Sequence, residues 1–410
     1  MVKGISSGFK ISQINLLKLH LLLLALIPIS QVELVEKKYV YFPLIGIYLI
    51  VLAAQLLLVN WRKSLGPSLW VLVFISYILV SMMLGTQQYL SNDIVIAAIP
   101  FFSIVLLPIF ISGAYQLWLK DKFFMIILIP TAAYTIKFYY ALILSSIKFG
   151  HISRLTLLAF DSVLSLNVLG LILLNIYVLM LNKKRKWLIL MTITFIPIIY
   201  TYTRSIIICL VLVGIYFMVR YTKLWTAKLL ILLPLAIFLI PVYQLTSNET
   251  SSVGKVVNIY VQRFSTIASP EDQGTRFNEI TLGFQRFIES PILGKNLGYK
   301  LAVPTDDGSV RITRYIHNGT IYILMNLGIV GYLFYYVIPI FIWLKIVTMK
   351  LPSDKQSRIW KLYLEGSLLY LILFSQFFAA VRLVHFNAFL LFHLSAIIVW
   401  IRMNRVRIMA

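Results

Sequence analysis

Apolar runs long enough to cross a bilayer recur along almost the whole chain. A helix needs about 20 mostly apolar residues to span the hydrocarbon core, and the sequence offers about twelve such segments. They lie at 14–30, 41–59, 69–84, 94–112, 123–145, 157–181, 187–200, 205–219, 227–243, 320–344, 362–380 and 386–401. The pattern predicts an all-α polytopic integral membrane protein. The first nine helices are predicted in 1–243, one large loop with short helices in 244–318, and the last three helices in 319–410.

Composition agrees with this class, because 60% of the 410 residues are hydrophobic and only 12% are charged. Lys and Arg gather in alternate connections, which together hold 21 of the 37 basic residues. Basic loops stay on the cytoplasmic side of a membrane. We therefore expect both termini to be cytoplasmic and the long loop to lie outside. The net charge of +23 then reflects topology and contact with anionic membrane lipid, and it gives no reason to invoke nucleic acid.

The long loop contains one amphipathic segment. From Thr275 onward, apolar residues at Ile280, Phe284, Phe287 and Ile288 share one face of a helix that Pro291 ends. Arg276 is expected in the first turn of this helix. Glu279 follows it by three residues and is close enough on a helix to form an ion pair with it.

A second arginine, Arg204, is expected to open a helix at the outer surface, where basic residues are not favoured. Thr201 or Thr203 is suited to cap that helix. A helix start presents free N–H groups and the positive end of the helix dipole, so an added guanidinium favours a phosphate group. The alternative for Arg204 is an arginine that reaches for the membrane interface, and for Arg276 a solvated residue on a surface helix.

His317 is the strongest candidate for a general base. It directly precedes the helix that begins near Thr320, and the positive end of that helix favours the neutral imidazole that a base requires. Asn318 is suited to orient it or to bind a hydroxyl group. A lone histidine is more often structural than catalytic, but two arginines expected on the same side of the membrane strengthen the catalytic interpretation.

Two acidic pairs invite a metal, Glu33 with Glu36 and Asp306 with Asp307. Nearby lysines offset the first pair, and the second pair belongs to an ordinary turn, so we expect no metal and no other cofactor. None of the fourteen acidic residues falls in the middle of a predicted helix. Ion-coupled carriers usually need such groups near the midplane, and their lack disfavours a carrier. A polysaccharide flippase or exporter without catalysis stays the competing interpretation.

Three motifs in fixed order resemble the O-antigen ligase and O-antigen polymerase superfamily. They are TRS at 203–205, GTRFNEITLGFQRFIESPILG at 274–294, and His317-Asn318 followed after nine residues by GIVG at 328–331. The predicted topology is also similar, with about a dozen spans and one large periplasmic loop. Many ligases carry an acidic residue just before the glycine of the last motif, whereas this chain has Met-Asn-Leu at 325–327.

The resemblance implies an inverting, metal-independent glycosyltransferase of the bacterial inner membrane. Its donor would be a glycan linked to undecaprenyl diphosphate, and its acceptor a hydroxyl of a glycan or of lipid A-core. Arg204 and Arg276 match the family's diphosphate-binding arginines, and His317 matches the histidine that activates the acceptor. A ligase and a polymerase differ only in the acceptor, so the resemblance leaves both open.

Overall fold

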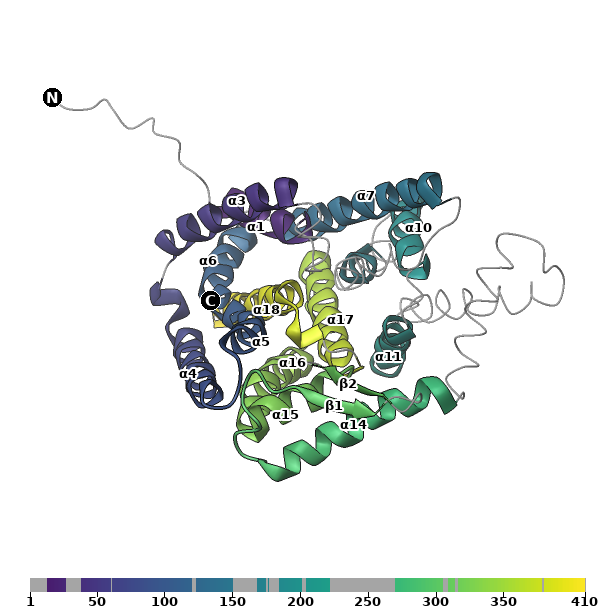
Figure 1. The fold of residues 1–410 in the computed structure, drawn as a ribbon. Coiled ribbons are helices and arrows are strands. Elements are labelled where there is room, and N and C mark those ends of the chain that lie inside the picture. Colours follow the sequence, from purple (N-terminus) through teal and green to yellow (C-terminus); the bar gives the residue numbers. More distant parts are fainter. Residues whose placement is uncertain are drawn as a thin grey trace.

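A computed structural model describes most of the chain. The described residues are 13–26, 38–59, 61–119, 123–149, 168–174, 176, 184–200, 204–221, 270–304, 309–313, 316–377 and 380–409. Within them the fold is almost wholly helical, as the sequence predicts (Figure 1). The first third of the predicted outer loop, 244–269, lies outside the described residues. So does the predicted span 227–243.

The helices in chain order are α1 (Gln13–Leu26), α3 (Lys38–Leu57), α4 (Trp61–Thr86), α5 (Ser91–Phe102), η1 (Ser103–Val105), α6 (Leu106–Leu119), α7 (Phe123–Phe149), α10 (Lys184–Tyr200), α11 (Arg204–Arg220), α14 (Pro270–Glu289), α15 (Gly319–Tyr332), η3 (Leu333–Val337), α16 (Ile338–Thr348), α17 (Lys355–Phe377), η4 (Ala380–Arg382) and α18 (Val384–Met409). Two short strands, β1 (Leu301–Pro304) and β2 (Val310–Thr313), form an antiparallel hairpin between α14 and α15.

Helix α18 forms the centre of the bundle, and α5, α6, α16 and α17 pack around it (Figure 1). Within the apolar stretch of α18, 89% of the residues are buried inside the protein, against 28% in the stretch of α4. An apolar helix that is buried on all sides belongs to a core, whereas one with an exposed apolar side faces lipid. Thus α18 is an internal helix and α4 is peripheral.

Four helical segments among the described residues have the length and composition to cross a membrane: Gly66–Thr86, Ser91–Tyr115, Gly319–Thr348 and Val384–Asn404. Each coincides with a predicted span. Three shorter apolar helices, Ile14–Leu24, Pro43–Leu57 and Ser205–Arg220, fall within three more of the predicted runs. The total of about 12 spans stays a prediction.

A buried carboxylate ties α11 to α17. Glu365 accepts hydrogen bonds from Lys361 Nζ at 2.8 Å, from Arg220 Nε at 2.9 Å and from Tyr221 at 2.9 Å. A buried charge is tolerated when it is paired in this way. The ring of Phe217 packs on Gly366 next to this cluster, so α11 runs antiparallel to α17. The first residue of α11, Arg204, therefore lies toward the opposite end of α17.

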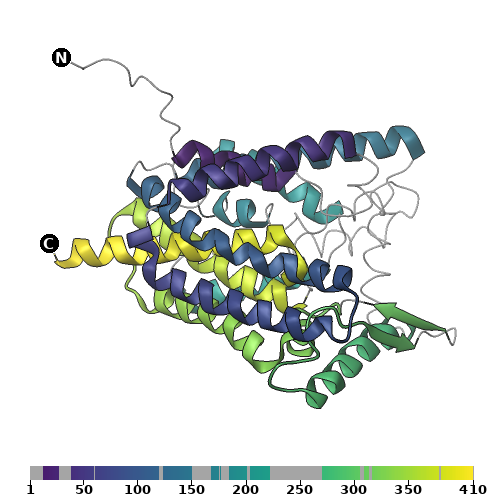
Figure 2. The ribbon, with the colours of Figure 1, turned by 60° about the vertical axis from the view of Figure 1, so that its left-hand side comes forward.

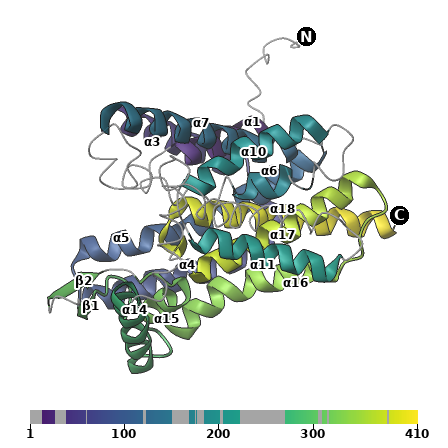
Figure 3. The same cartoon turned by 90° about the vertical axis from the view of Figure 1, so that its right-hand side faces the viewer.

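Basic residues mark one end of the bundle. Arg220 ends α11, Lys345 lies in the last turn of α16, Arg358 lies in the first turn of α17, and Arg402 lies near the end of α18. Helix α14 and the hairpin lie at the opposite end (Figures 2 and 3). This separation is the arrangement that the positive-inside rule predicts for a cytoplasmic and an outer face.

The long span at Gly319–Thr348 is interrupted at Gly328, whose φ of 61° and ψ of −166° are not helical. The loop that follows α14 fills the break. Ile329 N–H donates to Pro291 O at 2.9 Å, Val330 N–H donates to Ile292 O at 3.3 Å, and Lys295 N–H donates to Met325 O at 2.7 Å. Backbone groups at membrane depth must find partners inside the protein. The loop supplies them and thereby fixes α14 against α15.

Only glycine fits this interlock. The backbone conformation of Gly328 belongs to a region that residues with a side chain essentially do not enter, and a Cβ on Gly328 would run into the carbonyl of Ile292. Gly294 also has a positive φ, 71°, and a Cβ there would come within 2.6–2.7 Å of backbone atoms of residues 326–328. These contacts give a physical reason for the glycines of the SPILG and GIVG motifs.

Gly328→Ala should therefore destabilise the protein. Strained backbone alone costs about 1–3 kcal/mol, and the clash with Ile292 adds to it. We expect a clear drop in the thermal unfolding midpoint of the detergent-purified protein. Gly46→Ala is the control, because Gly46 lies inside α3 and a Cβ there meets nothing within 4 Å. Equal midpoints for the two variants would contradict the interlock.

Candidate active site

Helix α14 carries two of the residues that the sequence singles out. It runs from Pro270 to Glu289 and ends just before Pro291, as predicted. It begins five residues earlier than the sequence analysis placed it, so Arg276 lies in the second turn and not the first. The free N–H groups of the helix start are therefore not next to Arg276. An anion there must rely on the guanidinium itself.

The buried side of α14 packs against α15 and β1, and the hairpin was not predicted from the sequence. Its strands pair with Leu301 opposite Thr313 and Val303 opposite Arg311. An Asp-Gly pair between alternating apolar residues is a known hairpin signal, and the turn predicted at 306–309 has that pair. Residues 305–308 lie outside the described part. The hairpin brings Arg311, on β2, next to Glu279 of α14.

Glu279 lies where α14, the hairpin and the start of α15 meet. Its carboxylate is only 1% exposed although it belongs to a surface helix. One oxygen, Oε2, accepts from Nδ1 of His317 at 2.7 Å and from the backbone N–H of His317 at 3.3 Å. The other oxygen, Oε1, forms an ion pair with Arg311. Residues 32 and 38 positions apart in the chain are thus joined through one carboxylate.

These contacts set the tautomer of the neutral imidazole ring of His317. A carboxylate only accepts hydrogen bonds, so Nδ1 must carry the hydrogen. Nε2 is then the nitrogen that accepts a proton in the neutral ring. The side chain of His317 is 38% exposed, so the ring is held from one side and reachable from another. A base that is oriented by a buried carboxylate is the arrangement that activates hydroxyl groups in many transferases and hydrolases.

The environment also keeps Glu279 ionised. Burial alone would raise its pKa, but the hydrogen bonds from His317 and the charge of Arg311 outweigh burial and lower the pKa below its ordinary value. The stability that this lowered pKa contributes is fully present above the unfolded-state pKa of the residue. It is lost as the pH falls through the lower, folded-state value.

Asn318 has a structural task. It is the N-cap of α15, and its side-chain oxygen accepts from the N–H of Ile321 at 2.9 Å. This cap fixes the start of the helix directly after His317. Orientation of the imidazole therefore comes from Glu279, a residue that the sequence analysis considered only as a partner of Arg276. A contact between the amide of Asn318 and a substrate hydroxyl stays a prediction.

The two arginines are placed only by their backbones. Arg204 is the first residue of α11, as predicted, and Arg276 lies one turn before Glu279 on α14. Their side chains lie outside the described part, and so do Thr201 and Thr203. The expected ion pair between Arg276 and Glu279 and the binding of a diphosphate by both arginines stay predictions.

Metal binding is not indicated among the described residues, where no group of three or more His, Cys, Asp and Glu side chains is placed to hold an ion. The acidic pairs Glu33 with Glu36 and Asp306 with Asp307 lie outside this part. A metal-independent reaction therefore stays a prediction.

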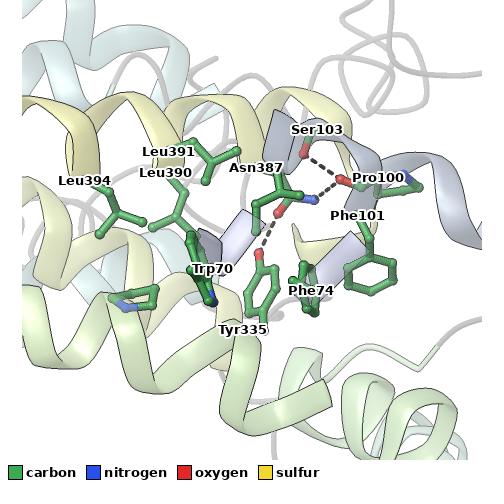
Figure 4. Close-up of a pocket in the computed structure, with 12 residues that line it drawn as sticks. Trp70, Phe74, Pro100, Phe101, Ser103, Tyr335, Asn387, Leu390, Leu391 and Leu394 are labelled. Atoms are coloured by element: carbon green, nitrogen blue, oxygen red, sulfur yellow. Dashed lines mark hydrogen bonds between the residues drawn. The ribbon is translucent and has the colours of Figure 1, made fainter. Parts of the chain in front are cut away.

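A small apolar pocket lies deep in the bundle, between α4, α5, α16 and α18 (Figure 4). Trp70, Phe74 and Leu394 help to line it. At one end, the amide of Asn387 donates to Pro100 O at 2.9 Å and accepts from the hydroxyl of Tyr335 at 2.5 Å. Asn387 thus pairs a carbonyl near the irregular turn η1 within a membrane span. None of the residues predicted for the site lines this pocket, so we assign it to packing.

Residues 188–336 match the family model described as O-antigen ligase. This part of the chain is therefore similar to O-antigen ligases. The match runs from α10 into η3, so it includes Arg204, Arg276, Glu279 and His317, and it supports the superfamily that the motifs resemble. No curated protein matches the chain.

Glu279→Gln should impair the expected transfer activity through its effect on His317. Glutamine is nearly isosteric, but it does not pair with Arg311 and does not stabilise a protonated His317. General bases contribute about 10²–10⁴-fold to a rate, and we expect part of this, about 10- to 100-fold, to be lost in kcat with little change in KM. Glu289→Gln is the control, because Glu289 forms ion pairs with Arg286 and Lys295 on the exposed side of the same helix. A larger effect on KM than on kcat would contradict a positioning role.

Arg311→Ala should change the pH dependence of the reaction that His317 is expected to catalyse. Loss of the positive charge raises the pKa of Glu279, so its carboxylate is neutralised at a higher pH. We expect the acidic limb of the kcat profile to move to higher pH, with the plateau at neutral to basic pH retained. Arg286→Ala, which removes one of the two ion-pair partners of exposed Glu289, should leave the acidic limb in place. An unshifted acidic limb in Arg311→Ala would contradict an influence of Arg311 on the pKa of Glu279.

Proposed function

We propose that the protein is an inverting membrane glycosyltransferase of the O-antigen ligase or polymerase type. It transfers or polymerises a glycan linked to undecaprenyl diphosphate at the periplasmic face of the bacterial inner membrane. The reaction serves lipopolysaccharide or another surface polysaccharide. The hydrogen bond between Glu279 and His317, inside the segment that matches the O-antigen ligase family, is the observation that supports this best.

The proposed chemistry begins at the acceptor hydroxyl of a glycan or of lipid A-core. Nε2 of His317 takes the hydroxyl proton as the oxygen attacks the anomeric carbon of the donor. The new C–O bond forms on the face opposite the diphosphate, and the old C–O bond breaks. Its electron pair leaves with undecaprenyl diphosphate, and the configuration is inverted. The carboxylate of Glu279 stabilises the imidazolium that results.

The leaving group gains negative charge as the bond breaks, and Arg204 and Arg276 are proposed to stabilise it. Guanidinium groups bind phosphate oxygens through two parallel hydrogen bonds, and they take over the neutralisation that a metal supplies elsewhere. The antiparallel packing of α11 on α17 supports this role. It brings the backbone of Arg204 toward the end of α17 where Gln376 bonds to Thr320, two residues beyond Asn318.

The orientation in the membrane is proposed from charge. The basic ends of α11, α16, α17 and α18 gather at one end of the bundle, away from α14 and the hairpin (Figure 3). A cytoplasmic location for that end gives cytoplasmic termini and an active site at the periplasmic face. The donor diphosphate lies at the same face once the lipid-linked glycan has been flipped.

His317→Ala tests the reaction directly. The purified protein is mixed with an undecaprenyl-diphosphate-linked repeat unit, with and without lipid A-core, in the presence of chelator. We expect the wild type to form product and the variant to be slower by about 10²–10⁴-fold. His151→Ala, which removes a histidine without an assigned role, is the control.

Growth of the glycan without lipid A-core selects a polymerase, and a product only with lipid A-core selects a ligase. In cells, the His317→Ala variant should accumulate lipid-linked precursor on the outer leaflet. Precursor trapped on the inner leaflet in a null mutant would instead support a flippase. A fully active His317→Ala variant would refute the role of His317 as the base.

A further inference from the structure

One side of α14 exposes apolar side chains that the proposed reaction does not use. Phe277 is 68% exposed, Phe284 45% and Ile288 59%, and Ile280 is exposed next to them. Their spacing of three, four and seven residues puts them on one face of the helix. The opposite face, with Glu279 and Gly283, is buried against α15 and β1. Helix α14 therefore has an apolar face directed away from the protein.

This apolar face is continuous with the lipid-facing side of a membrane span. On the segment Gly319–Thr348, Ile329, Leu333, Val337 and Phe341 are exposed at intervals of four residues, which makes a single stripe along the helix. The stripe begins where the loop after α14 enters the break in α15. In that loop Ile292 is 63% exposed, and its neighbour Pro291 accepts the hydrogen bond of Ile329. The exposed apolar surface thus passes from the span through the loop onto α14.

The direction of α14 fits a position at the membrane surface. The helix crosses the common direction of the bundle helices at the end opposite their basic residues (Figures 2 and 3). A helix in this position lies along the plane of the bilayer. Its flank carries ionic groups, since Glu289 is paired with Arg286 and Lys295. An apolar face, a charged flank and an orientation in the membrane plane are the features of interfacial helices.

We propose that α14 is an interfacial membrane helix whose Phe277–Phe284–Ile288 face is inserted among the acyl chains of the outer leaflet. The partner is the bilayer itself, at the boundary between headgroups and hydrocarbon. Such helices bury their apolar face about 5–10 Å into this boundary. Insertion therefore fixes the depth of α14 and of everything that α14 carries.

This depth has a consequence for the site, which rests on the proposed function. Arg276 and Glu279 belong to the same helix and are held at the level of lipid headgroups. A lipid-linked diphosphate lies at that level, so it meets Arg276 without leaving the membrane. The insertion itself does not depend on the reaction, and it is tested without any glycan present.

The single cysteine of the chain makes a labelling experiment direct. Cys209 is fully buried in α11, and Cys209→Ala gives a background without cysteine. Single cysteines at Phe284→Cys and Ile288→Cys carry a nitroxide spin label in the full-length protein, reconstituted in phospholipid vesicles. Gln285→Cys is the matched control, because Gln285 is exposed but lies about a quarter turn away around the helix. Phe341→Cys, on the stripe of the span, reports a lipid-facing site.

The measurement compares collisions of each label with oxygen, which concentrates in lipid, and with a water-soluble nickel complex. We expect the labels at 284 and 288 to resemble the label at 341, with oxygen favoured several-fold over nickel. The label at 285 should favour nickel. Nickel access at 284 and 288 equal to that at 285 would overturn the proposal, because the face would then lie in water. Exclusion of both reagents at 284 and 288 would overturn it too, because protein would then cover the face.

Discussion

The interruption of a membrane span at Gly328 is the constraint on which the site depends. A bilayer offers no water to backbone groups, so a broken helix is stable only where other parts of the protein bind the groups it frees. The loop at 290–295 does this with its own backbone. Because the loop is the direct continuation of α14, the same bonds that repair the span also hold α14 beside α15. The helix with Glu279 and the helix that follows His317 are thereby joined at a second point.

Two buried carboxylates in the described part of the protein show the same physics with different outcomes. Glu365 is surrounded by Lys361, Arg220 and Tyr221, which consume its hydrogen-bonding capacity and lock α11 onto α17. Glu279 is also paired with a cation, Arg311, but its second oxygen holds an imidazole that is 38% exposed. The first carboxylate can only stabilise the bundle. The second is bonded to an imidazole that is partly exposed at the surface.

The proposed site is assembled at the border between membrane and periplasm, and each layer of the structure contributes one property to it. The bundle supplies the antiparallel helices that carry Arg204 and the start of α15 to one end. Burial raises the pKa of Glu279, but the hydrogen bonds from His317, together with the positive charge of Arg311 on the hairpin, keep it ionised. The proposed interfacial face of α14 sets the depth of the site in the membrane. A transferase with a lipid-linked donor and a polar acceptor needs all of these at one boundary, because its two substrates come from different phases.

The sequence by itself determined the features that rest on local pattern. Hydrophobic runs located the four spans that the structure describes as long enough to cross the membrane, and periodicity located α14, the helix start at Arg204 and the helix after His317. The sequence also contains the true start of α14, which the periodicity placed five residues too late. Ser-Pro-Glu-Asp at 269–272 is a typical helix start, with proline and acids in the first turn. Only the tertiary structure decided that Glu279 orients His317, that Arg311 pairs with Glu279, and that Gly328 breaks a span. These contacts join residues more than thirty positions apart, and no local periodicity encodes which distant groups will share one buried carboxylate.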